Sequence, residues 1–310
     1  TSADVLDATS FPDSGIVMGF GYIGLELAPY IAEAGGTDLT VIEHDARPLD
    51  EADPAFGDEL LRIYEEVLGL QILTETYEER LEPTDDGGVR LYTDRDDEYA
   101  TIEADQLFLF TGRRPAVDRL GLEQTSIDPG PDWVRETLQA VDDDRVFVVG
   151  DVNGKEPILH VAKEQGFLAA DNLRSHRSGE PLKAYETLHH HVVFSGLGVV
   201  PYARLGHSAE SATAAGYDTV TATRRAEDDG VFLTKDAPFG LARLVVDATD
   251  GTVLGYQGLH YHADVMAKTM QVVIEQALTV YEIPDRAYHP TTPEIIDGLV
   301  RETRGQLPDE

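Results

Sequence analysis

Apolar residues in the first third of the chain alternate between short continuous runs and helical spacing. The runs have the length of buried strands and occupy residues 15–18, 39–42 and 106–110. Apolar residues recur every three or four positions over 22–34, which predicts a helix, and a second helix is expected over 55–68. A hairpin is expected from the runs at 89–92 and 101–102. The strand–helix–strand order predicts a parallel sheet with covering helices.

The two later stretches follow other patterns. Residues 115–181 offer one strand, 145–149, and one helix, 161–174. These are too few for a separate core, so the stretch is predicted to be half of a domain whose other half lies elsewhere. From residue 189 strands precede helices, which predicts an α+β domain with an antiparallel sheet. Its strands are expected at 192–194, 204–205, 220–223, 241–247 and 252–258, and its helices at 209–215, 263–277 and 293–303.

The net charge is the most unusual bulk property. The 310 residues include 58 acidic and 24 basic ones, only five of them lysines, and the net charge is −34. Such a surface repels nucleic acid and anionic membranes, so neither is expected as a partner. The acidic residues are spread along the chain rather than gathered in a tail, which is typical of halophilic proteins. Stability is therefore expected to fall as salt is lowered.

The chain contains no cysteine. A disulfide, a thiolate metal site and a cysteine nucleophile are thereby excluded within this chain. No run approaches the roughly 20 apolar residues of a membrane span, and no signal peptide is visible, so the cytoplasm is the expected location. The chain begins at Thr1 with a polar lead-in, which suggests a processed or cut fragment.

A dinucleotide fingerprint follows the first strand. Gly19, Gly21 and Gly24 fit Gly-x-Gly-x-x-Gly between a predicted strand and a predicted helix. In this pattern the first glycine permits a tight turn, the second lets a pyrophosphate approach the backbone, and the third lets the helix pack on the strand. The alternative, that three glycines simply end a strand, does not explain the acidic residue at the end of the next strand.

That acidic residue, Glu43, indicates the cofactor. A carboxylate at this position accepts hydrogen bonds from the ribose hydroxyls of NAD(H) and repels the 2′-phosphate of NADP(H). Arg47 lies four residues later and could soften this preference.

Five further segments resemble the dihydrolipoamide dehydrogenase, glutathione reductase and mercuric reductase family. The resemblance covers essentially the whole chain in the order NAD domain, end of the FAD domain, interface domain. The segments are Thr111-Gly112-Arg113-Arg114-Pro115, Asp118-Arg119-Leu120-Gly121-Leu122, Arg145-Val146-Phe147-Val148-Val149-Gly150-Asp151-Val152, Ile158-Leu159-His160-Val161-Ala162 with Glu164-Gln165-Gly166, and His289-Pro290-Thr291-Thr292-Pro293-Glu294.

The resemblance implies several cofactor contacts. Gly112 would lie against the bound NAD, and Glu26 would lie near the nicotinamide. Asp151 would accept a hydrogen bond from the ribityl chain of the flavin. The helix that begins near Val161 would point its N-terminus at the flavin ring, and Leu159 and His160, just before it, are candidate cofactor contacts. The alternative from the residues alone is that Asp151 is a turn aspartate and Glu26 a solvated helix residue.

The resemblance also implies a catalytic pair, His289 and Glu294. In the family this pair acts at the disulfide of the other subunit, where the histidine takes and returns a thiol proton and the glutamate orients the imidazole. Histidine suits this task because its usual pKa lies near neutral pH.

The resemblance has clear departures. The family begins with about 150 further residues that carry a first glycine fingerprint for FAD and a redox cysteine pair, so the chain resembles an N-terminally truncated member. Its expected layout is α/β, with a Rossmann-type NAD domain (1–114), an incomplete FAD domain (115–188) and an α+β dimerisation domain (189–310). We expect a homodimer that uses NAD(H), with FAD in the full-length parent, and reduces or oxidises a small disulfide or dithiol.

Two alternatives to a dihydrolipoamide dehydrogenase stay open at this point. The first is a reductase of a low-molecular-weight disulfide such as glutathione disulfide. The second is a non-catalytic protein that binds NAD or dimerises, if the gene encodes only this chain.

Other residues have structural explanations. His189, His190 and His191 alternate across a strand, so at most two could share a metal ion, and no metal site is expected. His260 and His262 are expected on one strand face with a packing role, and Trp133 in a core. Asp142, Asp143 and Asp144 are expected in a solvated loop.

Overall fold

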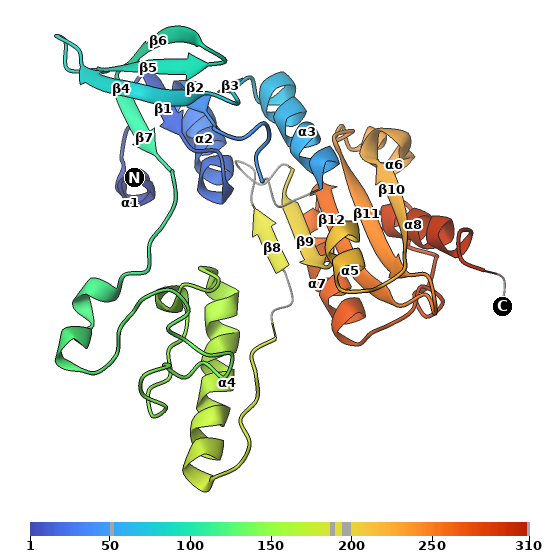
Figure 1. Cartoon of the computed structure of the whole chain (residues 1–310). Coiled ribbons are helices and arrows are strands. Elements are labelled where there is room, and N and C mark those ends of the chain that lie inside the picture. The colour runs from blue at the N-terminus through green and yellow to red at the C-terminus, as the bar shows by residue number, and fades with distance from the viewer. Residues whose placement is uncertain (50–52, 187–189, 194–199, 309–310) are drawn as a thin grey trace. The chain divides into compact units, whose positions relative to one another are not determined.

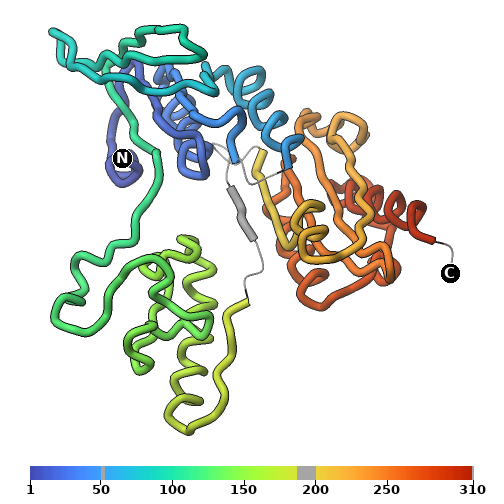
Figure 2. Tube along the Cα trace, viewed as in Figure 1, coloured from blue at the N-terminus to red at the C-terminus, as the bar shows by residue number. Residues whose placement is uncertain are grey.

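The computed structural model describes residues 1–49, 53–186, 190–193 and 200–308, with the side chains of 190–193 excepted. The chain forms two compact units. The first unit combines Thr1–Thr111 with His189–Glu310, and the second is Gly112–Leu188. The tube in Figure 2 follows the chain out of the first unit after the strand β7 (Gln106–Leu109) and into the second, green and yellow-green unit.

The N-terminal part of the first unit is the expected parallel sheet. Its strand order is β3-β2-β1-β7, with β2 paired in parallel to β1 and β3. The strands are β1 (Ser14–Met18), β2 (Asp38–Ile42), β3 (Gln71–Leu73) and β7 (Gln106–Leu109), and the helices are α1 (Ser2–Asp7), α2 (Tyr22–Gly35) and α3 (Pro54–Arg62). The predicted strands and the first helix are thus confirmed (Figure 1). The helix α2 ends where Gly36 adopts φ +69°, as a C-terminal cap requires.

Two features of this part differ from the prediction. The helix expected over 55–68 is α-helical only to Arg62 and continues as a π-helical turn, Ile63–Val67. The predicted hairpin is a three-stranded antiparallel sheet of β4 (Tyr77–Pro83), β5 (Val89–Arg95) and β6 (Glu98–Ala104). The periodicity did not reveal β4 because most of its residues are exposed and polar.

The C-terminal part of the first unit is the expected antiparallel sheet with helices. Its strand order is β10-β11-β12-β9-β8. Residues Leu241–Val246 of β11 are apolar and buried except for Arg243, which is half-buried, so both faces of the strand lie largely in the core. The elements are β8 (His190–Val193), β9 (Tyr202–Gly206), α5 (Ala209–Ala214), β10 (Thr219–Arg225), α6 (Gly230–Thr234), β11 (Gly240–Asp247), β12 (Val253–His260), α7 (Ala263–Glu275) and α8 (Glu294–Arg304).

One placement in this part was wrong. His260 and His262 do not share a strand face, because β12 ends at His260 and His262 lies beyond it with φ +69°, immediately before α7. His260 is fully buried, and its Nε2 lies 3.0 Å from the hydroxyl of Tyr256.

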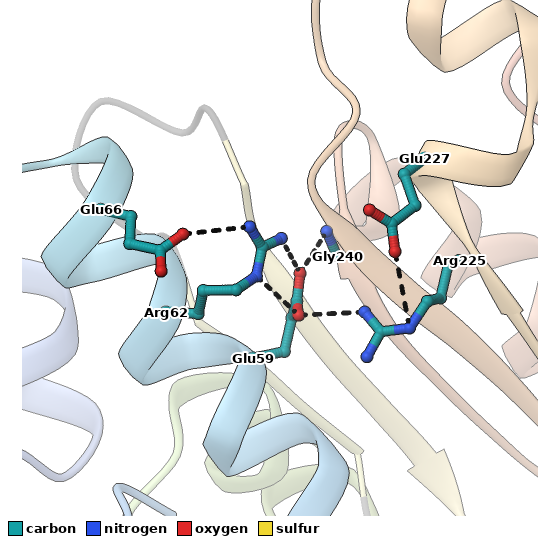
Figure 3. A network of polar contacts seen from close by, with 6 residues as sticks. All are labelled: Glu59, Arg62, Glu66, Arg225, Glu227 and Gly240. Atoms are coloured by element: carbon teal, nitrogen blue, oxygen red, sulfur yellow. Dashed lines mark hydrogen bonds and ion pairs between the residues drawn. The ribbon is translucent and has the colours of Figure 1, made fainter.

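A buried carboxylate connects the two parts of the first unit. Glu59 of α3 is 3% exposed and pairs through both oxygens with Arg62, at 2.5 and 3.1 Å. It also accepts hydrogen bonds from Arg225 at 3.1 Å and from the backbone N–H of Gly240 at 2.9 Å (Figure 3). Burial raises the pKa of Glu59, but these hydrogen bonds outweigh it and hold the pKa below its usual value. Nearby, Asp53 pairs with Arg243 of β11.

The second unit contains one long helix and little other regular structure. The helix α4 spans Leu159–Ser178 and is longer than the predicted 161–174. The strand expected at 145–149 is absent: Phe147 forms only an isolated bridge with Gln139, because no neighbouring strand in this unit extends the pairing. Trp133 is 7% exposed and packs in a small apolar cluster with Ile127 and Val148.

Candidate functional site

Three glycines form the turn between β1 and α2. Gly19 has φ +93°, and a Cβ there would lie 2.7 Å from the carbonyl oxygen of Phe110. A Cβ at Gly24 would lie 2.3 Å from the carbonyl oxygen of Gly19. A Cβ at Gly21 would meet no atom within 4 Å. Gly19 and Gly24 therefore allow close backbone packing, whereas Gly21 leaves open space where α2 begins, as a bound pyrophosphate would need.

Glu43 is fixed beside this turn. Its Oε2 accepts a hydrogen bond from the N–H of Phe20 at 2.6 Å, within the glycine turn. Its Oε1 accepts from the N–H groups of His44 and Asp45, at 2.7 and 3.1 Å. The structure thus brings together Glu43 and the glycine turn, which are 23 residues apart in the sequence. The carboxylate is oriented by backbone groups and keeps acceptor capacity for a ribose hydroxyl.

Arg47 forms an ion pair with Asp58 of α3. Its Nε pairs with the carboxylate of Asp58, and its Cβ lies where a side chain at Gly57 would be. The guanidinium is therefore held against α3 by Asp58. This arrangement leaves the repulsion between Glu43 and a 2′-phosphate uncompensated by Arg47.

Sequence reasoning missed an aromatic pair next to Glu43. The rings of His44 and Tyr77 are stacked with centroids 4.7 Å apart, and the Nε2 of His44 lies 2.5 Å from Glu78. Because a carboxylate only accepts, this nitrogen carries the hydrogen. Tyr77 belongs to the unpredicted strand β4, so no sequence pattern placed it near His44. Glu26 lies half-buried on α2, one turn after Tyr22.

The second unit contains four of the predicted cofactor residues. Gly112 has φ +121° with no atom within 4 Å of a Cβ position, and Asp151 is exposed at the start of a short 3₁₀ turn. Leu159 and His160 form the first turn of α4, which has no side-chain cap. The N-terminal end of a helix is suited to a polar or anionic group.

A buried amide network positions the Asp151 turn. Gln165 is fully buried, and its Oε1 accepts hydrogen bonds from the N–H of Gly150 and from Asn153, both at 2.7 Å. The Nε2 of Gln165 has no hydrogen-bond partner among the described residues. Gln165 lay within a family-like segment, but its contact with Gly150 depends on the tertiary fold and was not predicted.

His289, on the loop before α8, lies beside Glu294, the first residue of that helix. The Nδ1 of His289 is 3.0 and 3.1 Å from the two carboxylate oxygens of Glu294. The hydrogen bond from the N–H of Thr291 and the contact with His289 lower the pKa of Glu294, so the carboxylate is ionised near neutral pH. Nδ1 must then carry a hydrogen, which leaves Nε2 as the basic nitrogen of the neutral imidazole. The imidazole is 78% exposed.

Two groups of residues raise the question of a metal site: the three consecutive histidines and the three consecutive aspartates. Within the described part of the chain, no group of three or more His, Asp or Glu side chains is placed to hold a metal ion. Of the three consecutive histidines, His189 lies outside the described residues, and the side chains of His190 and His191 are not described. Asp143 pairs with Arg145 at 2.7 Å, in a loop where Asp142 and Asp144 are exposed.

The fold defines the class of protein before any comparison: a Rossmann-type α/β domain joined to an antiparallel α+β domain. Two family models then match the chain. Residues 1–166 match "Pyridine nucleotide-disulphide oxidoreductase", and residues 191–299 match the dimerisation domain of the same family. The chain therefore belongs to the pyridine nucleotide-disulphide oxidoreductase family. No helix among the described residues is long and apolar enough to cross a membrane.

Several relatives are dihydrolipoyl dehydrogenases. That of Halobacterium salinarum is 29% identical over 300 residues, which cover 94% of this chain and 60% of the relative. That of Geobacillus stearothermophilus is 29% identical and covers 95% of this chain and 61% of its own length. The chain thus spans about 60% of the length of these curated relatives.

Solved structures show the same fold. The HOCl-induced flavoprotein disulfide reductase RclA from Escherichia coli has a TM-score of 0.81 at 22% identity, covering 96% of this chain and 66% of the reductase. LpdA from Mycobacterium tuberculosis has a TM-score of 0.79 at 21% identity, covering 96% of this chain and 62% of LpdA.

Proposed function

We propose that this chain is part of a flavin-dependent NADH:disulfide oxidoreductase of the dihydrolipoamide dehydrogenase type. The observation that carries the proposal is the His289–Glu294 pair, in which an ionised carboxylate holds Nδ1 and leaves Nε2 basic. This pair occurs in the same chain as a glycine turn bonded to Glu43. The dihydrolipoyl dehydrogenases among its relatives support the substrate class, a small disulfide or dithiol.

We assign three domains within this proposal. Residues 1–114 form the NAD domain, 115–188 the C-terminal portion of the FAD domain, and 189–310 the dimerisation domain. The exposed apolar residues of α4 support the middle assignment. Leu159, Phe167 and Leu173 are 72%, 78% and 46% exposed, as expected for a domain portion that packs against further chain.

The residues present fit NAD(H) and part of an FAD site. Gly19, Gly21, Gly24 and Glu43 would hold the pyrophosphate and ribose of NAD(H), with Gly112 and Glu26 nearer the nicotinamide. For FAD, Asp151 would accept from the ribityl chain, and the α4 terminus at Leu159 and His160 would face the ring. The orphaned Nε2 of Gln165 beside the Asp151 turn supports a polar group binding there. When bound, the two cofactors supply hydride and electron transfer.

His289 would act on a thiol proton. The basic Nε2 can accept the proton of a dithiol substrate and later return it to the leaving thiolate, while Glu294 stabilises the imidazolium. The thiol comes from outside this chain, which has no cysteine. We place the protein in the cytoplasm, where NADH and reduced thiols occur together.

The proposed assembly is a homodimer. The dimerisation-domain match supports it, and so do Val265 and Val272, which lie one above the other on α7 and are 64% and 49% exposed. Replacing both by Glu should produce a monomer in sedimentation velocity at high salt, whereas Tyr99→Glu, at a 73% exposed position of β6, should leave a dimer. A monomeric unmodified protein would contradict the assembly.

The test of the function is an NADH oxidation assay with the protein produced from its complete gene in molar KCl. We expect turnover with lipoamide and little with glutathione disulfide. His289→Gln should reduce turnover by about 100-fold or more, as expected for loss of a general acid–base group. Preference for glutathione disulfide would favour a low-molecular-weight disulfide reductase. NADH binding without turnover of either disulfide would favour a non-catalytic NAD-binding protein.

A further inference from the structure

One face of α8 carries a row of charged side chains. Glu294, Asp297, Arg301 and Arg304 follow one another at intervals of three, four and three residues, which places them on the same side of the helix. The opposite side is anchored in the core, where Ile295, Leu299 and Val300 are fully buried against the antiparallel sheet. The row therefore stands on a rigid support.

This row binds the backbone of the segment before the helix, in reverse order. Arg304 donates to the carbonyl oxygens of Val280, at 2.6 and 3.0 Å, and of Ile283, at 2.9 Å. Arg301 donates to the carbonyl oxygen of Asp285 at 3.4 Å.

The carboxylates of the row continue the same order towards His289. Asp297 accepts from the N–H of Ala287 at 2.6 Å, and Glu294 accepts from the N–H of Thr291 at 3.0 Å. The row thus lines up antiparallel to residues 280–291, with acids where the segment presents N–H groups and arginines where it presents carbonyls.

The two acidic tethers bracket His289. Ala287 lies two residues before the histidine and Thr291 two residues after it. Between them, Tyr288 and the imidazole are 90% and 78% exposed, so packing does not hold the ring in place. Asp297 is only 8% exposed, and a buried carboxylate that accepts a backbone N–H orients that N–H strongly.

We propose that Asp297 is a positioning residue for His289: it fixes the backbone at Ala287 so that the imidazole meets Glu294 through Nδ1. The inference rests on the proposed role of the His289–Glu294 pair. Asp297 does not touch the reacting atoms. Its loss frees the backbone before His289, the Nδ1–H bond to Glu294 is made less often, and the imidazole takes the other tautomer, in which Nε2 carries the hydrogen and cannot accept a proton.

The tautomer of His289 is the direct readout. Long-range ¹H–¹⁵N spectra of the full chain labelled at histidine, recorded at alkaline pH and high salt, distinguish Nδ1–H from Nε2–H, and His289→Gln assigns the signal. We expect mainly the Nδ1–H form in the unmodified protein. In Asp297→Ala the ratio of Nδ1–H to Nε2–H should fall by about tenfold, as for loss of a charge-assisted hydrogen bond.

Two variants control this experiment. Asp297→Asn keeps an oxygen that can accept from Ala287 and should retain most of the Nδ1–H form. Glu302→Ala removes another carboxylate of α8, one that pairs with Arg224 at 2.7 Å, and should leave the tautomer unchanged. An unchanged ratio in Asp297→Ala, or an equal fall in Glu302→Ala, would overturn the positioning role.

The amide of Ala287 provides a measurement on the unmodified protein, should Asp297→Ala fail to fold. Its hydrogen exchange should be slower than that of Tyr288, and equally fast exchange would overturn the proposal. An unmodified protein with mainly Nε2–H at His289 would instead contradict the proposed His289–Glu294 pair, so the two failures are distinguishable.

Discussion

At the level of single residues, the glycines of the first turn differ in what a side chain would meet. A methyl group at Gly24 would collide with the carbonyl oxygen of Gly19, whereas one at Gly21 would project into open space. The two positions share a motif, yet Gly24 is required by packing, whereas at Gly21 only a bound ligand would oppose a side chain. This difference makes them separable by substitution.

Gly21→Ala is predicted to weaken NADH binding by at least about tenfold. The melting temperature should stay within about 2 °C of that of the unmodified protein, because no atom lies within 4 Å of the added methyl. Gly24→Ala should instead lower the melting temperature. NADH fluorescence titration and thermal unfolding measure both. Equal NADH affinity in Gly21→Ala would contradict the pyrophosphate site.

The buried His260 should make the stability of the protein depend on pH. Burial lowers its pKa to about 4, whereas in the unfolded chain the pKa is close to 6.5. Between these values the unfolded state binds a proton that the folded state does not, so stability is lost as pH falls from about 6.5 to about 4. The 2.5-unit difference corresponds to roughly 3 kcal/mol.

The test compares the unmodified protein with His260→Gln by denaturant unfolding at high salt. The difference between their free energies of unfolding separates the effect of His260 from that of the carboxylates. The stability advantage of His260 at pH 7 should shrink by roughly 3 kcal/mol at pH 4. A difference between the two proteins that does not depend on pH would show that His260 titrates normally.

At the level of elements, α3 is joined to the antiparallel sheet by a charge network rather than by apolar contacts alone. Glu59 satisfies two arginines and one buried N–H, that of Gly240 (Figure 3). Asp58, the preceding residue, pairs with Arg47 at the surface, where Asp58 is 59% exposed. Neighbouring carboxylates of one helix therefore differ mainly in burial.

Glu59→Ala is predicted to destabilise the protein by roughly 3 kcal/mol, since it leaves the N–H of Gly240 buried without an acceptor and removes the partner of Arg62 and Arg225. Asp58→Ala should cost less than about 1 kcal/mol, as for other exposed ion pairs. Denaturant unfolding measures both, and equal effects would contradict a special role for Glu59.

Some strands could be predicted from the sequence and others could not. Strand β1 was predictable because burial on both faces produces a continuous apolar run, and β11 because Arg243 alone interrupts its apolar residues from Leu241 to Val246. The exposed strand β4 has no such run, and residues 145–149 are apolar without partner strands to complete a sheet. Composition could not reveal either case, because pairing depends on which distant segments are available.

The same holds for the candidate site. The glycine turn and Glu43 were predictable because a local motif encodes their chemistry. The tethers formed by Asp297 and Gln165 were not, because a helix-face aspartate and a buried glutamine acquire their roles only when the fold brings Ala287 and Gly150 beside them.

At the level of the whole molecule, the net charge of −34 acts against the compact state. Self-repulsion of this size is weakened by salt, since the screening length falls from about 10 Å at 0.1 M to about 3 Å at 1 M.

The melting temperature is therefore predicted to rise by several degrees between about 0.1 M and 1 M KCl. Differential scanning calorimetry measures the change, with a protein of near-zero net charge as the control. A melting temperature that does not respond to KCl would contradict the electrostatic argument.

We propose that this chain serves a flavoenzyme that uses NADH. The most direct test is the visible absorbance spectrum of the protein produced from its complete gene in molar KCl, before and after addition of NADH. We predict flavin bands that bleach when NADH is added. A colourless protein, or flavin bands that NADH leaves unchanged, would contradict the claim.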